Sequence, residues 1–202
     1  MVLGSYRVFG TPGVDRVHRI GGAREGTRTM IRFTVMTTEL GSFAFVARDG
    51  RLVATFTPSH GGDVKRFIRE RWPDAVETPR AMPRFRRQIM SFFTGRPTAF
   101  DVEIDVASFS PFQQRIFEAC RCIPYGKTAS YGELAAAAGT PGAARAVGNT
   151  MARNPIPIVI PCHRVVRSDG SLGGFSSPDG TREKLRLLEL EGARFADCIA
   201  VA

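Results

Sequence analysis

A cysteine and a histidine lie next to each other at Cys162 and His163, directly after a stretch that contains Pro155, Pro157 and Pro161. A cysteine is a strong nucleophile only as its thiolate, which forms with the help of a base or a positive environment. Because neighbouring side chains of an extended chain point to opposite sides, contact between thiol and imidazole needs a turn or a bridging water. The alternative is that Cys162 is a small buried residue without chemistry, as most free cysteines are. The local sequence leaves both interpretations open.

The other cysteines and histidines do not extend this pair into a metal site. No two cysteines have the CxxC spacing, and the full set is Cys120, Cys122, Cys162, Cys198, His18, His60 and His163. Neither a structural zinc site nor a disulfide framework has this spacing. We therefore expect free thiols in a reducing compartment and no metal site.

The charge of the chain favours a polyanionic partner. It has 28 lysines and arginines against 19 acidic residues, which gives a formal net charge of +9 and a pI near 10.2. Such an excess favours nucleic acid because each phosphate contact releases a condensed counterion, although solubility alone is the alternative explanation. No apolar run approaches the roughly 20 residues that span a bilayer, and the first residues lack the features of a signal peptide. We expect a soluble intracellular protein.

The elements before residue 107 predict a small α+β domain over 30–106. Strand patterns occupy 31–35, 43–46 and 52–56, and Asp49-Gly50 between the last two is a hairpin signal. Helices are expected near 62–72 and 84–94, and a further strand over 99–104. Residues 1–29 are rich in glycine and arginine and form an N-terminal extension that could be a flexible tail.

The second half predicts a mostly helical domain over 107–202. Ser110-Pro111 is a strong helix start, and Gly139 is a natural helix end. Helices are expected to begin at 111 and to span 131–138, 142–153 and 181–191, with an extended, stiff run over 154–161 and a glycine-rich loop over 168–180. Two short helices joined by a glycine-containing turn are typical of a helix-turn-helix, a pattern also common in proteins that do not bind DNA. The predicted class is therefore α+β, with a winged-helix-like second domain.

The motifs of this half resemble one known family. The segments that carry the resemblance are 112–113, 123–126, 130–135, 145–149, 154–158, 160–166, 173–176 and 184–192. The most specific of them contains Pro161-Cys162-His163-Arg164-Val165. In order and spacing, residues from about 110 to 192 are similar to the O6-alkylguanine-DNA alkyltransferases, also called methylated-DNA–protein-cysteine methyltransferases. Residues 30–106 resemble the N-terminal domain of that family in pattern only.

The resemblance implies direct repair of double-stranded DNA, by a single irreversible transfer of an alkyl group from O6 of guanine to Cys162, a displacement that needs no metal or organic cofactor. His163 would act as the base through a water, oriented by an acidic residue for which we favour Glu191 over Glu189. The resemblance also implies that Asn154 holds the loop, that Tyr131 presses on the flipped nucleotide and donates to the purine, and that Arg145 is inserted into the DNA. Further DNA contacts would come from Ala144, Met151 and Arg153. The alkyl pocket would be lined by Met151, Pro157, Val165, Leu172, Gly173, Phe175 and Ser176. The resemblance further implies a monomer in the cytoplasm, or in the nucleus of a eukaryote.

Several departures from the family pattern leave alternatives open. Phe175 replaces a tyrosine common in relatives, Asn149-Thr150 replace small residues, and the loop after Phe175 is about two residues longer. A lesion sensor of the same fold typically lacks the acceptor cysteine, which is present here. A Cys–His hydrolase would need an oxyanion hole, for which no local signature is visible. A plain helix-turn-helix transcription factor would leave the Pro-Cys-His-Arg segment unexplained.

Overall fold

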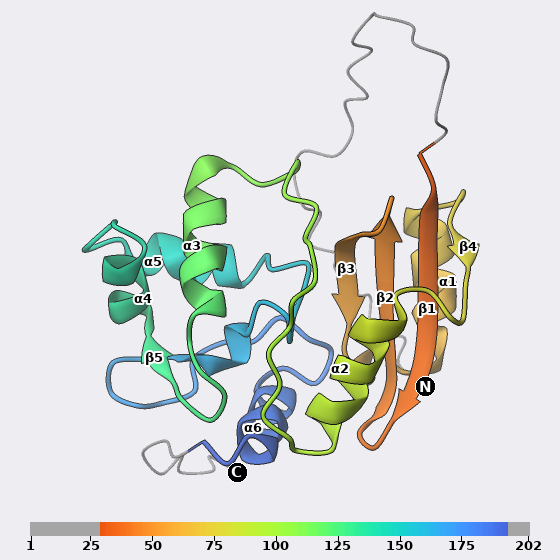
Figure 1. The fold of residues 1–202 in the computed structure, drawn as a ribbon. Helices are drawn as coiled ribbons and strands as arrows, with labels where there is room; N and C mark the ends of the chain where they lie inside the picture. Colours follow the sequence, from red (N-terminus) through yellow and green to blue (C-terminus); the bar gives the residue numbers. More distant parts are fainter. Residues whose placement is uncertain (1–28, 194–202) are drawn as a thin grey trace, which may run out of the picture.

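A sheet in the N-terminal part lies beside a group of helices in the C-terminal part (Figure 1). The structure is a computed structural model that describes residues 29–193. Residues 1–28 of the expected extension over 1–29 lie outside the described residues, as does Cys198. The helices and strands are β1 (Ile31–Thr38), β2 (Gly41–Arg48), β3 (Arg51–Phe56), η1 (Pro58–Asp63), α1 (Val64–Arg71), β4 (Val76–Glu77), α2 (Pro83–Phe93), α3 (Pro111–Arg121), β5 (Ala129–Ser130), α4 (Tyr131–Ala137), α5 (Ala144–Met151), η2 (Cys162–Arg164), β6 (Val165–Val166) and α6 (Thr181–Leu190). The predicted α+β class is confirmed.

The sheet has the order β3-β2-β1-β4, with only β4 parallel to its neighbour. The three predicted strands are therefore confirmed. Asp49 and Gly50 join β2 to β3 with φ angles of 48° and 83°. Two successive positive φ values belong to the tight hairpin turn that Asp-Gly favours, because its twist matches that of the strands.

Helices cover both faces of the sheet (Figure 1). Because side chains alternate along a strand, Phe43 and Phe45 of β2 join the core cluster that contains α2, whereas Ala44 and Val46 join the one that contains α1. The predicted helices near 62–72 and 84–94 correspond to α1 and α2. The cluster with α2 continues without interruption into α3, α4 and α5 and reaches Cys162. The two halves of the described chain thus share one hydrophobic core.

The strand predicted over 99–104 is wrong. Within it only Ile104 forms a β-bridge, with Leu52 of β3. Side chains occupy two of the carbonyl groups that a strand would use: Gln88 Nε2 donates to Ala99, and Arg121 Nη2 donates to Phe100. The segment therefore crosses the edge of β3 at a single point.

The helices of the C-terminal part begin and end at the signals in the sequence. Ser110 and Ser130 each form a capping box, with Gln113 and Glu133 respectively, at the starts of α3 and α4. Gly139 ends the turn after α4 with a φ of 70°. α5 is shorter than the predicted 142–153, because Gly142 has a φ of 83°, outside the helical range. α4 and α5 contact each other. Their use as a helix-turn-helix on DNA stays a prediction.

The proline-rich run before Cys162 is irregular, as the prolines require, but it is not extended throughout. Ile158 has a φ of 76°, and the amide of Ile160 donates to the carbonyl of Ile156 at 2.9 Å. The chain therefore turns back on itself within the run. Thr55 of β3 fixes this turn from the sheet, since its amide donates to Pro155 O at 3.0 Å and its Oγ1 to Pro157 O at 2.7 Å. The edge strand thus supports the loop that carries the cysteine.

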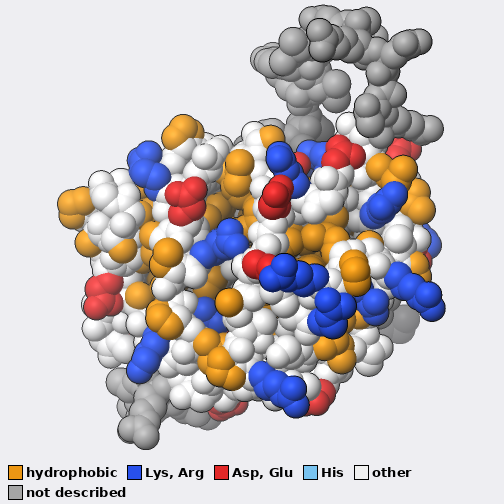
Figure 2. All heavy atoms as spheres, viewed as in Figure 1, with side chains coloured by type: hydrophobic (Ala, Val, Ile, Leu, Met, Phe, Trp, Pro, Cys, Tyr) orange, Lys and Arg blue, Asp and Glu red, His pale blue; other side chains and the backbone are white. Residues whose placement is uncertain are grey.

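Positive side chains are spread over the face of the molecule that Figure 2 shows. Figure 2 shows Lys and Arg on both halves of one face, densest over the N-terminal half. Charge alone therefore marks no single DNA-binding surface on this face. Among residues 29–193, no helix is both long and apolar enough to cross a membrane.

Candidate active site

Cys162 follows a turn that the Asn154 side chain closes. Asn154 Nδ2 donates to the carbonyl of Ile160 at 2.8 Å and to Cys162 Sγ at 3.2 Å. Its Oδ1 accepts from the amide of Ile156 at 3.0 Å. Cys162 then begins the 3-10 helix η2, so the chain turns at Cys162 and His163, and within residues 29–193 no hydrogen bond joins Cys162 Sγ to His163 Nδ1. An N–H group directed at sulfur stabilises the thiolate more than the thiol.

His163 is fully buried, and its Nε2 lies 2.8 Å from Glu191 Oε1. Burial by itself raises the pKa of Glu191, but the hydrogen bond and charge of His163 and the guanidinium of Arg164 outweigh it and lower this pKa to about 2. The carboxylate is therefore ionised and can only accept, so Nε2 carries the imidazole proton and Nδ1 has a lone pair. Nδ1 is buried and has no hydrogen-bond partner within residues 29–193. The imidazole thus has one nitrogen whose lone pair is free to accept a proton.

Arg164 balances the charge of the same carboxylate. Its Nε lies 2.9 Å and its Nη2 2.8 Å from the two oxygens of Glu191, and its Nη1 donates to Ile123 O at 2.6 Å. The amide of Gly126 donates to Glu191 Oε2 at 3.0 Å. Burial and the nearby cation both lower the pKa of His163, while Glu191 raises it, with a net lowering. The imidazole is therefore neutral at neutral pH and able to take up a proton.

The Cys162 thiol is protonated in the free protein. Burial raises its pKa, and the hydrogen bond from Asn154 and the charge of Lys184 lower it only in part. Lys184 is itself buried, and its Nζ donates to the carbonyls of Val165 at 2.6 Å and of Leu172. Formation of a Cys162 thiolate would therefore require transfer of the thiol proton to a base.

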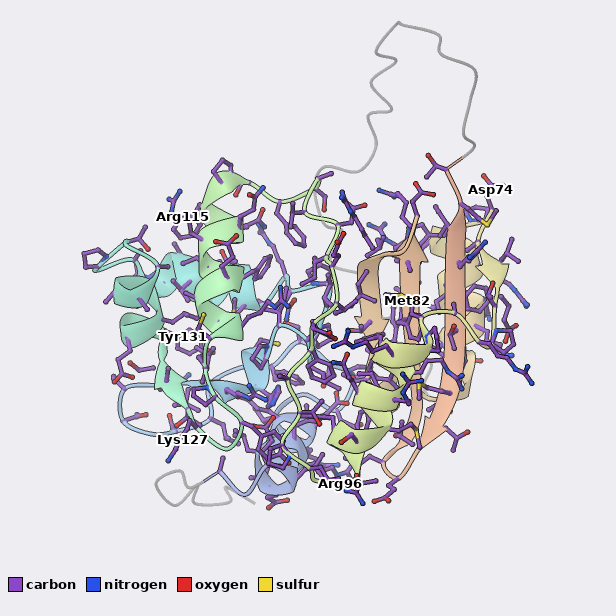
Figure 3. The ribbon with its side chains drawn as sticks, in the orientation of Figure 1. Asp74, Met82, Arg96, Arg115, Lys127 and Tyr131 are labelled. Carbon is purple, nitrogen blue, oxygen red and sulfur yellow. The ribbon has the colours of Figure 1, made fainter. Side chains whose placement is uncertain are left out.

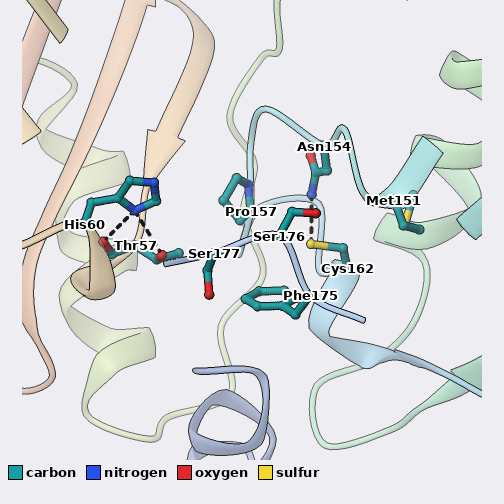
Figure 4. A pocket seen from close by; sticks show the side chains of 9 residues that line it. All are labelled: Thr57, His60, Met151, Asn154, Pro157, Cys162, Phe175, Ser176 and Ser177. Carbon is teal, nitrogen blue, oxygen red and sulfur yellow. Dashed lines mark hydrogen bonds between the residues drawn. The ribbon is translucent and has the colours of Figure 1, made fainter. Parts of the chain in front are cut away.

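A pocket that is partly open to solvent lies against Cys162 (Figure 4). Its lining residues are Thr57, His60, Met151, Asn154, Pro157, Cys162, Phe175, Ser176 and Ser177. Four residues expected in the pocket wall, Met151, Pro157, Phe175 and Ser176, are among them. The cysteine is 8% exposed and lines this pocket.

Three other residues expected in the wall lie outside it. Val165 is fully buried and pairs with Ala129 between β5 and β6. Leu172 turns its carbonyl to Lys184. Gly173 lies against Tyr131, because a Cβ there would meet the phenol oxygen at 3.1 Å. The segment 172–173 therefore contacts Tyr131 and Lys184 and does not line the pocket.

Known proteins are similar to this chain in sequence and in structure. A family model described as "6-O-methylguanine DNA methyltransferase, DNA binding domain" matches residues 111–193. A methylated-DNA–protein-cysteine methyltransferase of Mycolicibacterium paratuberculosis is 39% identical over 168 residues, which cover 80% of this chain and 93% of that protein. The chain belongs to the methylated-DNA–protein-cysteine methyltransferase family. The family resemblance seen in the sequence is thereby confirmed.

Other relatives extend the match over both halves of this methyltransferase family member. A constitutive relative from Bacillus subtilis is 32% identical, covering 79% of this chain and 94% of that protein. The crystal structure of the Mycobacterium tuberculosis O6-methylguanine methyltransferase has a TM-score of 0.68 at 36% identity, covering 84% of this chain and 96% of that one. A structure of the M. tuberculosis protein in complex with DNA has a TM-score of 0.67 at 35% identity, covering 80% and 92%.

Residues expected to contact DNA lie around α4 and α5 of this methyltransferase. Arg145 is exposed in the first turn of α5 beside the half-buried Ala144, and Arg153 is exposed just after the helix. Tyr131 begins α4 (Figure 3) and lies between Gly148 of α5 and Gly173. Burial raises the pKa of Tyr131, so its hydroxyl keeps its proton and can donate.

The sequence missed several members of this methyltransferase site. Thr57, His60 and Ser177 line the pocket, and Arg164 and Lys184 are the buried cations beside it. Thr57 and His60 are about a hundred residues from Cys162, and no local pattern marks them. For the described residues, no group of three His, Cys, Asp or Glu side chains could hold a metal ion.

Proposed function

We propose that this protein repairs double-stranded DNA by moving the alkyl group from O6 of guanine to Sγ of Cys162, after the damaged nucleotide has been flipped out of the helix. The observation that carries the proposal is a buried thiol on a pocket, next to a neutral histidine whose Nδ1 has no protein partner within residues 29–193 and whose Nε2 is bound to Glu191. The family of the chain supplies the substrate class.

The reaction is an in-line displacement at an sp³ carbon. The thiol proton passes through a water to Nδ1 of His163, and the resulting imidazolium is stabilised by Glu191. The Sγ–C bond forms while the C–O6 bond breaks, and guanine leaves with the bonding electrons before it takes up a proton. Tyr131 donates its hydroxyl proton in a hydrogen bond to the purine as negative charge develops there. The thioether is stable, so one molecule repairs one lesion.

Access to O6 requires the nucleotide to leave the base stack, which costs a few kcal/mol. Arg145 is exposed at the start of α5 and would fill the space that guanine leaves. We further propose that the protein acts as a monomer, in the cytoplasm or in the nucleus of a eukaryotic cell, where free thiols stay reduced.

Transfer to a named atom gives the direct test. Incubation with a duplex that contains O6-methylguanine should add one methyl group to the Cys162 peptide, with at most one methyl per protein by mass spectrometry. Cys162→Ala should show none, while Cys122→Ala, which removes an exposed cysteine, should react as the wild type does. Repeated turnover, or an unmodified peptide with the duplex bound, would overturn the proposal in favour of a hydrolase or of a DNA-binding protein without transfer.

Arg145→Ala should slow repair of the duplex by about ten- to a hundredfold, because part of the flipping cost is no longer offset. The reaction of the same variant with free O6-benzylguanine should change little, since no base has to be flipped. Arg115→Ala removes the same charge from the exposed face of α3 and serves as the control in both single-turnover assays. Equal slowing with the duplex and with the free base would contradict the insertion role.

A further inference from the structure

The pocket has a polar end that the reacting atoms do not use. In Figure 4, Cys162 and Met151 lie at one end, Thr57 and His60 at the other, and Pro157 is among the residues between them. The polar end comes from the segment after β3, in the other half of the chain. Ser59 holds this segment against α6, because its Oγ donates to Glu183 Oε2 at 2.6 Å. The two halves therefore build one continuous pocket.

His60 is fixed with one particular nitrogen available. Its Nδ1 lies 3.1 Å from the carbonyl oxygen of Thr57, which can only accept, so Nδ1 carries a proton. The edge-to-face contact with Phe56, at 5.4 Å between ring centroids, holds the ring plane. Burial lowers the pKa of His60, although the bond to Thr57 and the charge of Glu183 oppose this, and the ring is neutral at neutral pH. Nε2 therefore has a lone pair, and no group within residues 29–193 hydrogen-bonds to it.

The geometry of displacement determines where a long substituent must go. Sulfur and O6 occupy opposite sides of the reacting carbon, so the rest of the alkyl group has to leave that carbon sideways. With Arg145 inserted as proposed above, guanine lies on the side of α5, so the free direction runs along Pro157 towards the segment of Thr57 and His60. Methylene groups can pack on Pro157 and Phe175, and only a substituent of several carbons reaches the imidazole.

We propose that Thr57 and His60 form a subsite for the far end of long O6 substituents, and that this subsite prefers a terminal hydroxyl, which donates its hydrogen bond to Nε2 of His60. The ligand class is O6-(ω-hydroxyalkyl)guanine in DNA. The inference rests on the proposed transfer to Cys162 and adds a selectivity to it. The bonds that form and break are those of the displacement described above.

Matched pairs of substrates test the preference. Duplexes carry either an n-alkyl or an ω-hydroxyalkyl group of the same chain length, from two to six carbons, and single-turnover rates give a hydroxyl-to-alkyl ratio at each length. The wild type should favour the hydroxyl about three- to tenfold at the length that reaches His60 and should show no such preference at two carbons. His60→Phe, which keeps an aromatic ring but has no acceptor nitrogen, should bring the ratio down to that of the shortest pair.

Two further variants separate a hydrogen bond from a change of shape. His60→Gln keeps an acceptor atom and should retain part of the preference. Arg66→Ala removes an exposed side chain of the following helix α1 that does not line this pocket, and it should keep the wild-type ratio. A wild-type ratio near one at every length, or an equal fall of the ratio in Arg66→Ala and His60→Phe, would overturn the subsite.

Both rates in a hydroxyl-to-alkyl ratio are measured on the same variant. A partly unfolded preparation therefore lowers both rates and leaves their ratio unchanged. Failure of the proposed function would appear differently, as absence of transfer from O6-methylguanine to the wild-type protein. Transfer without a hydroxyl preference would overturn only the subsite.

Discussion

Glu191→Gln should slow alkyl transfer at least about a hundredfold and also lower the stability of the fold by about 3 kcal/mol. The carboxylate accepts from His163, from Arg164 and from the Gly126 amide at once. A glutamine offers an N–H₂ group to some of these donors, which leaves a buried guanidinium partly unpaired. If that group donates to His163 Nε2, the imidazole proton moves to Nδ1 and the base loses its lone pair.

Single-turnover rates on an O6-methylguanine duplex measure the first effect, and urea unfolding measures the second. The rates are compared at a temperature where circular dichroism shows both proteins folded. Glu189→Gln is the matched control, because Glu189 is exposed two residues earlier and should behave as the wild type. A Glu191→Gln variant that reacts at the wild-type rate would remove the histidine–carboxylate pair from the mechanism.

The two carboxylates also show what the sequence could decide. Both stand at the end of the last predicted helix, and only the family resemblance favoured Glu191. In the structure Glu191 lies at the end of α6, turned inward to His163, while Glu189 points to solvent. The catalytic role of Glu191 stays a prediction that the variants above test.

Local signals predicted most of the elements because each depends on neighbouring residues. The capping boxes of Ser110 and Ser130 and the hairpin at Asp49-Gly50 are formed within a few residues. The prediction of a strand over 99–104 was wrong for the opposite reason, because residues distant in the sequence decide the conformation of this segment. Its hydrophobic pattern is compatible with a strand, but distant side chains, Gln88 and Arg121, occupy its carbonyl groups.

The site residues also fall into those that the local sequence indicated and those that it could not indicate. The Pro-Cys-His-Arg segment is contiguous, so its motif could be recognised in the sequence. The Thr57 and His60 end of the pocket could not, since it depends on how β3 docks against the loop over 155–157. Arg164 belonged to the motif, yet its bond to Ile123 O and its pairing with Glu191 required the fold. Sequence therefore indicated the reacting groups, and packing decides what surrounds them.

Asn154→Asp should slow the reaction about a hundredfold at neutral pH and move the pH–rate profile to higher pH. The substitution keeps the shape of the side chain and the oxygen that accepts from Ile156. It replaces the N–H group that donates to Ile160 O and Cys162 Sγ by a second oxygen, which repels both. Burial already raises the pKa of Cys162, and the hydrogen bond from Asn154 is the first of the influences that oppose it. A negative charge at this place disfavours the thiolate further, so its pKa must rise and more hydroxide is needed to reach the same rate.

The measurement is the rate of reaction with free O6-benzylguanine between about pH 6 and 10, which separates sulfur chemistry from DNA binding. Asn149→Asp makes the same chemical change at an exposed position of α5 and should leave the profile in place. If Asn154→Asp lowered the rate equally at every pH, the amide would only hold the loop, and the sulfur would not depend on its N–H group. A shifted inflection with partial recovery at high pH instead shows that a single amide both closes the turn and lowers the cost of ionising a buried thiol.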